Sequence, residues 1–236
     1  MKKQEAIYNM HGIKETSNTL RIVWFVSHSI FLYIAYLICF DDKLLWLDSI
    51  LDVDFQGGNF YRRCCLWGFG VLMYIRMNLT TFYLLKRKIQ IDEFFGVLIA
   101  YFTYQIAFVL LGGWNTTPIG ILDYAGILLF FLGSYINTYS EIQRKRFKKD
   151  PDNKGKLYTL GLFKLARHIN YFGDICWVLG WAIITHNIWS GLIPISLTLG
   201  FIFFFIPQLS SYLETNYSED YVDWKNNTKS LFPYLY

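Results

Sequence analysis

Two apolar segments of this chain carry, at one of their ends, an asparagine followed four residues later by a carboxylate. The first pair is Asn137 and Glu141, and the second is Asn170 and Asp174. On a helix, residues i and i+4 share one face, so each pair would present an amide beside a carboxylate. A carboxylate in a membrane-spanning segment is costly to desolvate, which makes it a candidate functional group.

The residues between the two pairs are rich in lysine and arginine. They also include Pro151, Gly155 and Gly161, so the segment from Arg144 to Lys164 is not expected to be one continuous helix. Amides donate and accept hydrogen bonds, carboxylates accept them, and lysine and arginine bind phosphate. The combination predicts a cradle for a phosphorylated cofactor at the membrane surface. The chain has no Gly-x-Gly-x-x-Gly turn after a strand and no Walker loop, so a nucleotide would bind without a Rossmann fold.

The composition predicts that these groups belong to a membrane protein. The chain is 54% hydrophobic and only 17% charged, whereas a soluble domain is ~25% charged. The last two apolar segments are short and joined only by His186-Asn187, which predicts a tight helical hairpin. We therefore expect an all-α, polytopic transmembrane helix bundle, formed as a single domain over residues 1–236. A span needs ~20 apolar residues, and the candidate segments run near 20–40, 64–85, 93–112, 119–139, 171–185 and 188–206.

The distribution of positive charge predicts the orientation. With six spans, both termini share a side with the basic segment, and the opposite side holds only Lys43, Arg62 and Arg63. Positive residues favour the cytoplasmic face, so we expect both termini in the cytoplasm. The membrane would be the inner membrane in a bacterium or the endoplasmic reticulum in a eukaryote. The polar first twenty residues lack a cleavage site, so the first apolar segment is expected to remain as an anchor.

Other polar residues in the apolar segments have a structural and a functional interpretation. Arg76 would either pair with a carboxylate of a neighbouring span or take part in function. Asp123 is typical of an N-terminal charge favoured by the helix dipole, while His28 and His186 are interpreted as structural. The cysteines show no metal-ligand spacing, so no metal site and no disulfide framework are predicted. They are Cys39, Cys64, Cys65 and Cys176.

The second Asn–carboxylate pair lies in a run that resembles a known family. The chain is similar to the C-terminal domain of the steroid 5α-reductase family, and closer still to the bacterial-type relatives grouped as DUF1295. The resemblance covers residues 120–236 well and residues 72–87 less closely. It is carried by Gly133–Glu141, Gly161-Leu162-Phe163, Arg167-His168-Ile169-Asn170-Tyr171-Phe172-Gly173-Asp174, Gly180-Trp181, Glu219–Trp224 and Thr228–Pro233.

The resemblance implies a bundle of about seven transmembrane helices, so we expect six to seven spans, with NADPH in a cavity at the cytoplasmic side. Lys148 and Lys156 would lie near the cofactor phosphates, and Tyr221 and Trp224 belong to a tail that covers the cofactor. The full set of implied cofactor-binding residues is Asn137, Glu141, Lys148, Lys156, Arg167, His168, Asn170, Tyr171, Asp174, Tyr221 and Trp224. Two positions depart from the family pattern. Ile169 replaces the usual proline, and Asp174 replaces the usual glutamate, which shortens the reach of the carboxylate.

The leading hypothesis is a membrane-embedded, NADPH-dependent reductase of an electron-poor C=C bond in an apolar, lipid-like substrate. A protein acid would polarise the conjugated carbonyl and stabilise the enolate. One well-placed hydrogen-bond donor of this kind lowers the activation free energy by about 3–4 kcal/mol. Tyr74, Tyr101 and Tyr104 are candidate donors, because a phenol is cheaper to bury than a charge. Arg76, which resembles an arginine common in the bacterial-type relatives, is the fourth catalytic candidate. The catalytic Glu–Tyr pair of steroid 5α-reductases does not align with the N-terminal half of the chain.

Two alternatives have different chemistry. A methyltransferase of the isoprenylcysteine or phospholipid type, with S-adenosylmethionine as cofactor, shares the Arg-His-x-Asn-Tyr region. Such enzymes usually carry glutamate and arginine where this chain has Ser210-Ser211-Tyr212, which favours the reductase. A non-catalytic lipid-binding protein of the same fold is the third possibility. The expected partners are the bilayer and an apolar small molecule, with no nucleic acid, and the chain is expected to be a monomer.

Overall fold

The computed structural model describes residues 17–44, 46–85 and 87–235. All regular secondary structure in these ranges is helical, as the sequence predicts. The long helical segments in these ranges are α2 (Asn18–Phe40), α4–η2 (Phe60–Asn78 and Leu79–Leu84), α5–η3–α6 (Ile91–Phe102, Thr103–Ala107 and Phe108–Gly112), α7 (Ile121–Lys149), α8 (Ile169–Ile184) and α9–η7–α10 (Leu192–Gly200, Phe201–Phe205 and Ile206–Asn227). Three of them contain a π-helical stretch, labelled η2, η3 or η7. The short helices are η1 (Asp42–Leu44), α3 (Trp46–Leu51), η4 (Pro151–Asn153), η5 (Gly161–Lys164) and η6 (Ile188–Gly191).

Within the described residues, four helical segments are long and apolar enough to cross a membrane. They are Asn18–Phe40, Ile91–Gly112, Ile121–Lys149 and Ile188–Asn227, and Ile169–Ile184 is a shorter apolar helix. The remaining long helix, α4, carries Arg62, Arg63 and Arg76. Each of the six predicted apolar segments is therefore helical, and the chain is an integral membrane protein of the helical-bundle class.

Two helices extend beyond the spans predicted within them. The helix that contains the span predicted near residues 119–139 continues as α7 to Lys149, so Arg144–Lys149 belongs to a helix and the loop begins at Asp150 rather than at Arg144. The segment that contains the span predicted near residues 188–206 continues through α10 to Asn227. Hydropathy marks only the apolar part of a helix, whereas Glu, Gln, Lys and Arg support helix beyond it.

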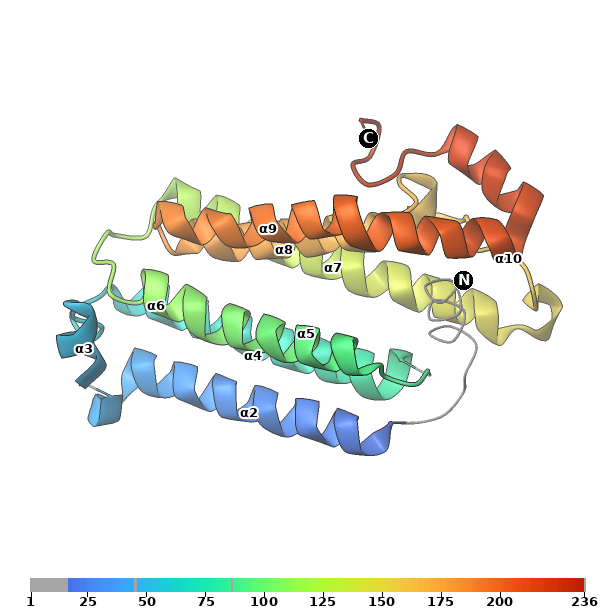
Figure 1. Ribbon diagram of the computed structural model, residues 1–236. Coiled ribbons are helices and arrows are strands. Elements are labelled where there is room, and N and C mark those ends of the chain that lie inside the picture. Colours follow the sequence, from blue (N-terminus) through green and yellow to red (C-terminus); the bar gives the residue numbers. More distant parts are fainter. Residues whose placement is uncertain (1–16, 45, 86, 236) are drawn as a thin grey trace. The chain divides into compact units, whose positions relative to one another are not determined.

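The contacts between residues divide the chain into two compact units. The N-terminal unit comprises residues 17–130 and 179–193, and the C-terminal unit comprises residues 131–178 and 194–235. In the N-terminal unit, α2 packs against α4 and α5, and Figure 1 shows α2, α4, α5 and α6 running side by side. The side chain of Asn59 accepts a hydrogen bond from the backbone N–H of Arg62 at 3.2 Å and so caps the start of α4.

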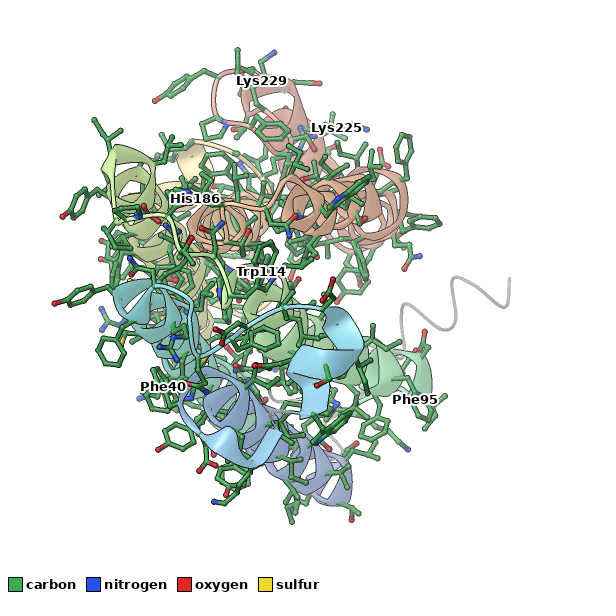
Figure 2. All side chains as sticks on the ribbon, turned by 90° about the vertical axis from the view of Figure 1, so that its left-hand side faces the viewer. Phe40, Phe95, Trp114, His186, Lys225 and Lys229 are labelled. Carbon is green, nitrogen blue, oxygen red and sulfur yellow. The ribbon has the colours of Figure 1, made fainter. Side chains whose placement is uncertain are left out.

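A fully buried ion pair holds the N-terminal unit together near the start of α7. Arg62 Nη1 lies 2.6 Å from Asp123 Oδ1, and neither side chain is exposed. The guanidinium also donates to the carbonyls of Ile184 and Thr117, and Asp123 Oδ2 accepts from the backbone N–H of Gly120 at 2.8 Å. Asp123 does sit in the first turn of its helix as predicted, but its counter-charge is Arg62 rather than the helix dipole alone. Figure 2 looks onto the end of this unit where α2 ends at Phe40 and where His186 follows α8.

In the C-terminal unit, two glycines let α7 and α8 approach each other closely. A Cβ added at Gly173 would lie 2.6 Å from the backbone N of Asn137, and one added at Gly133 would lie 2.4 Å from the backbone N of Trp177. Both distances are too short for real Cβ atoms, so the approach depends on glycine. The close approach places the Asn137 turn of α7 against the start of α8, where Asn170 lies.

The end of α10 folds back over the start of α8. The helix kinks at Ser218, where φ is 38° and ψ is −111°. Figure 1 shows α10 turning back on itself before the C-terminus. Beyond the kink, Tyr221 and Trp224 pack in one apolar cluster with Phe163 and Ile169. Leu231 is buried in a second cluster with Ile175, Phe201 and Ile206. We call residues 219–230, between the kink and Leu231, the strap.

Candidate functional site

The structure brings Asn137, Asn170 and Glu141 into one hydrogen-bonded chain within the C-terminal unit. Asn137 Nδ2 donates to the backbone carbonyl of Asn170 at 3.1 Å. Asn170 Nδ2 in turn donates to Glu141 Oε1 at 3.0 Å, and Arg144 Nη2 donates to Glu141 Oε2 at 2.5 Å. The two helices predicted to present amides and carboxylates therefore meet at these residues.

Asp174, the carboxylate of the second pair, makes a contact within its own helix. Its Oδ1 accepts a hydrogen bond from Trp177 Nε1 at 2.8 Å. The usual glutamate of the family pattern would extend this carboxylate by one methylene. Asp174 therefore belongs to the same helical face as Asn170, and it accepts a hydrogen bond from a tryptophan one turn further along α8.

The side chain of His168, two residues before Asn170, is buried and makes no hydrogen bond to the described residues. Its side chain is 1% exposed, and neither ring nitrogen has a hydrogen-bond partner among the described residues. The imidazole stacks on Tyr171, with ring centroids 5.5 Å apart, and Tyr171 stacks on Phe201 at 4.3 Å. Burial, together with the charges of Arg167 and Arg144, lowers the pKa of His168 to about 3. The ring is therefore neutral near pH 7 and offers one donor and one acceptor.

The three predicted basic residues occupy different settings. Lys148 is exposed at the end of α7 and donates from Nζ to Tyr217 Oη at 2.9 Å. Lys156 is exposed in the loop that follows η4. Arg167 instead engages the strap, because its Nη1 donates to the carbonyls of Lys225 at 2.7 Å and Thr228 at 2.9 Å. Lys148 and Lys156 are thus both exposed to solvent, whereas Arg167 binds protein carbonyls.

Tyr221 and Trp224 lie on the inner face of the strap. Trp224 Nε1 donates to the carbonyl of Phe163 at 3.3 Å. Tyr221 is fully buried, and its hydroxyl has no hydrogen-bond partner among the described residues. A buried hydroxyl without a partner is unfavourable, so Tyr221 and His168 both present polar atoms that a bound molecule could satisfy.

The four catalytic candidates all lie in the N-terminal unit, where their side chains have different neighbours. Tyr74 and Tyr101 both contact the ring of His28, with centroid distances of 5.1 and 4.0 Å. Tyr74 Oη also lies 3.0 Å from Ser29 Oγ. Tyr104 stacks on Phe108 at 6.3 Å, and Arg76 is half-buried in the last turn of α4.

One residue of this tyrosine cluster, Gln105, is not identified by sequence reasoning. Gln105 is 1% exposed, and its Nε2 donates to His28 Nε2 at 2.8 Å and to the carbonyl of Gly70 at 3.0 Å. Gln105 lies in the π-helix η3, and π-helical turns are frequent at functional sites. His28 was interpreted as structural, and here it joins Gln105 to both tyrosines. An amide four residues after Tyr101 in an apolar segment was the available signal.

The fold and the site define a helical membrane protein with a polar site where two helices meet beside a C-terminal strap. Some buried polar atoms of this site have no hydrogen-bond partner among the described residues. The chain belongs to the family described as "Protein of unknown function (DUF1295)", whose model matches residues 60–228. The predicted family is confirmed, and the match begins well before residue 120. It includes α4, α7, α8 and almost all of the strap.

Three curated proteins are similar to parts of the chain. "Steroid 5-alpha-reductase DET2" of Gossypium hirsutum is 31% identical over 120 residues, which is 48% of this chain and 42% of that protein. "Delta(14)-sterol reductase erg24" of Schizosaccharomyces pombe is 37% identical over 82 residues, 29% of this chain and 19% of that protein. "Probable O-methyltransferase ustE" of Ustilaginoidea virens is 38% identical over 91 residues, 37% of this chain and 31% of that protein. The chain thus spans less than half the length of each of these relatives.

Proposed function

We propose that the protein is a membrane-embedded reductase that uses NADPH to reduce an electron-poor C=C bond in an apolar, lipid-like substrate. The observation that carries the proposal is the series of hydrogen bonds from Asn137 through Asn170 to Glu141. The ring nitrogens of His168 and the hydroxyl of Tyr221, in the same unit, have no hydrogen-bond partner among the described residues. Similarity to a steroid 5-alpha-reductase and a sterol reductase supports the reaction class. Sterol, polyprenol, enoyl lipid and fatty acyl chain all remain candidate substrates.

The residues present suit NADPH. Its amide, ribose hydroxyls and phosphates need both donors and acceptors, and His168 and Tyr221 are buried polar groups that lack partners among the described residues. Asn137, Asn170 and Glu141 would hold the nicotinamide and ribose portion. Arg144, Lys148 and Lys156 would face its phosphates as cations. Asp174, Tyr171, Trp224 and Arg167 complete the set taken from the family pattern.

NADPH supplies a hydride to the β carbon of an enone when it is bound. The protein's own part is to polarise the carbonyl oxygen and provide a proton. Tyr101 is the strongest candidate acid, because its ring stacks on His28 and His28 is hydrogen-bonded to Gln105. Tyr74, bonded to Ser29, is the second candidate. A phenol can donate a hydrogen bond to a substrate carbonyl without adding a buried charge.

The membrane orientation forms part of the proposal. The basic residues of α7 and of the loop after it would face the cytoplasm, where NADPH is available, and both termini would lie on that side. The terminal residues 1–16 lie outside the described residues. The protein would act as a monomer and take its substrate from the bilayer of the bacterial inner membrane or the endoplasmic reticulum.

A methyltransferase that uses S-adenosylmethionine is the alternative function. The observation that favours it is the 38% identity to a probable O-methyltransferase over 91 residues. Against it stand Ser210, Ser211 and Tyr212, which lack the acidic and basic side chains usual at this place in such enzymes. The two functions differ in cofactor, so cofactor binding separates them.

The test is a thermal melt of the purified protein in detergent with NADPH or S-adenosylmethionine. A ligand at 100 times its Kd stabilises the folded state by about 2.7 kcal/mol. We expect NADPH to raise Tm, Asn170→Ala to abolish the rise, and the matched exposed change Asn226→Ala to preserve it. A rise with S-adenosylmethionine alone would assign the protein to the methyltransferases. No rise with either cofactor would favour a non-catalytic lipid-binding protein.

A further inference from the structure

Polar side chains that are almost fully buried form a connected cluster inside the N-terminal unit. His28 and Gln105 are each 1% exposed, and Thr81 and Tyr101 are each 4% exposed. They come from α2, from η2 at the end of α4, and from the continuous segment α5–η3, and Figure 1 shows α2, α4 and α5 side by side. Polar groups inside membrane-spanning segments are costly to desolvate, so this cluster is a candidate for function.

The hydrogen bonds of Gln105 fix which atom of its amide faces His28. Gln105 Nε2 lies 3.0 Å from the carbonyl oxygen of Gly70. A carbonyl only accepts, so the atom beside it must be the amide nitrogen and not the amide oxygen. The same nitrogen lies 2.8 Å from Nε2 of His28, which must therefore accept the second amide hydrogen. His28 is consequently neutral and carries its proton on Nδ1.

Gly70 gives the Gln105 amide the room to take this orientation. A Cβ added at Gly70 would lie 2.3 Å from Gln105 Oε1, so a side chain there would displace the amide. Gln105 Oε1 has no hydrogen-bond partner among the described residues, so the two donated bonds hold the amide. Gly68 lies in the same helix, and a Cβ added there meets nothing within 4 Å. The two glycines therefore form a matched pair for experiment.

The imidazole of His28 in turn holds the ring of Tyr101. The two rings stack with centroids 4.0 Å apart and planes inclined by 16°. The Tyr101 side chain is also hydrogen-bonded to the side chain of Thr81. The phenol is thus fixed at its face by a stacked ring and at its hydroxyl by a hydrogen bond.

The proton of the neighbouring Tyr74 is committed to Ser29. Ser29 Oγ donates its single hydrogen to the carbonyl of Phe25 at 2.8 Å. Tyr74 Oη lies 3.0 Å from the same Oγ, so the phenol must be the donor of that pair. Tyr101 is therefore better placed than Tyr74 to donate to a substrate carbonyl.

We propose that Gln105 and His28 are positioning residues for the acid of the reductase. The Gln105 amide holds His28 as the neutral Nδ1–H tautomer, and the imidazole holds the Tyr101 phenol in the orientation that donates to the substrate carbonyl. Both residues act through Tyr101 and touch neither substrate nor cofactor. The inference rests on the proposed function, since Tyr101 is taken as the acid.

Nitrogen NMR of isotope-labelled histidine in the full chain in detergent tests the tautomer. The chain has four histidines, so comparison with His28→Phe assigns the His28 signals. We expect a protonated Nδ1 and an unprotonated Nε2 in the wild type and in Gly68→Ala. Gln105→Met, which is similar in size but cannot donate, and Gly70→Ala should give a mixture of tautomers. A proton on Nε2 in the wild type would overturn the inference.

Steady-state reduction of a steroid enone probe by NADPH tests the positioning role. Gln105→Met and Gly70→Ala should lower kcat by about 10- to 100-fold, because a shift of about 1 Å in a catalytic group costs up to about 100-fold. The KM for NADPH should stay unchanged, and Gly68→Ala should match the wild type. In a Tyr101→Phe background, Gln105→Met should have no further effect, since residues that act as a unit are not additive.

The double variant separates positioning from a merely structural role. A loss of kcat that depends on the Tyr101 hydroxyl and accompanies the change of tautomer supports the inference. An equal loss from Gln105→Met with and without that hydroxyl assigns Gln105 to the fold alone and overturns it. Wild-type kcat in Gln105→Met also overturns it, and the proposed function then stands. If the wild type does not reduce the enone, both the acid and its positioning fall, whereas an NADPH-induced rise in Tm would still support the cofactor.

Discussion

Asn170 Nδ2 lies 3.0 Å from Glu141 Oε1, and this hydrogen bond joins the start of α8 to the middle of α7. The two residues are 29 positions apart in sequence. The bond fixes the orientation of the Asn170 amide, because its nitrogen must face the carboxylate and its oxygen must then face elsewhere. Glu141 is held in turn by Arg144. The relationship therefore presets one acceptor, the Asn170 Oδ1 atom, for a ligand.

The close packing of α7 on α8 predicts a strong effect of Gly173→Ala. The new Cβ would meet the backbone of Asn137 and Gly133 at 2.6 and 2.8 Å, so the helices must separate. Overpacking of this kind costs roughly 1–3 kcal/mol. We expect a lower Tm in detergent and loss of the NADPH-induced rise. The matched control is Gly96→Ala in α5, where a Cβ meets nothing within 4 Å. Equal Tm values for the two variants would contradict the packing argument.

The buried ion pair of the N-terminal unit predicts a large loss of stability for Asp123→Asn. The change leaves the guanidinium of Arg62, which is fully buried, without its carboxylate. Removal of one partner from a buried pair costs about 3–5 kcal/mol. Thermal or denaturant unfolding in detergent measures the loss. Asp223→Asn, on the exposed face of the strap, serves as control and should be near neutral; a similarly small effect at Asp123 would show that the pair contributes little.

The lowered pKa of His168 predicts a pH dependence of stability. In the unfolded chain this histidine is protonated below about pH 6.5, whereas in the folded chain it stays neutral down to about pH 3. The unfolded state therefore binds more protons between these values, and stability falls as pH drops through this window, by up to about 1.4 kcal/mol per pH unit. His168→Phe keeps the ring that stacks on Tyr171 and removes the titration. We expect Tm plotted against pH to be flatter in the variant, and parallel curves would refute the assignment.

The tyrosine cluster predicts that Tyr101→Phe lowers turnover of a steroid enone probe with NADPH. Loss of one oriented donor to a developing oxyanion reduces kcat by roughly 100- to 1,000-fold. The ring that stacks on His28 is retained, so the fold and the NADPH-induced Tm rise should persist. Tyr104→Phe preserves the stacking on Phe108 and is expected to have a much smaller effect. If Tyr74→Phe rather than Tyr101→Phe abolishes turnover, the acid is Tyr74.

The sequence predicts the helices, the shared face of Asn137 and Glu141, and the shared face of Asn170 and Asp174, because all of these rest on local periodicity. Apolar runs mark the helices, and an amide and a carboxylate at i and i+4 must share a face. Glycine at 133 and 173 then permits the contact between α7 and α8, although only the structure shows that their backbones touch.

The remaining features depend on contacts or backbone states that sequence periodicity does not encode. The bond between Gln105 and His28 joins residues 77 positions apart and uses a π-helical turn. The kink at Ser218 lies in a polar stretch without glycine or proline, so it carries no local signal. Arg167 was expected at the cofactor by analogy, whereas its partners are backbone carbonyls, and any residue type supplies those.

The central claim is that Asn170 and Glu141 hold NADPH as a coupled pair. Calorimetric titration of NADPH against the wild type, Asn170→Ala, Glu141→Gln and the double variant measures this coupling directly. Residues in one hydrogen-bonded network show interaction energies of about 0.5–3 kcal/mol. We predict that each single change weakens NADPH binding and that the double change weakens it by less than the sum of the two. Unchanged Kd values in the single variants, or binding of S-adenosylmethionine in place of NADPH by the wild type, would contradict the account.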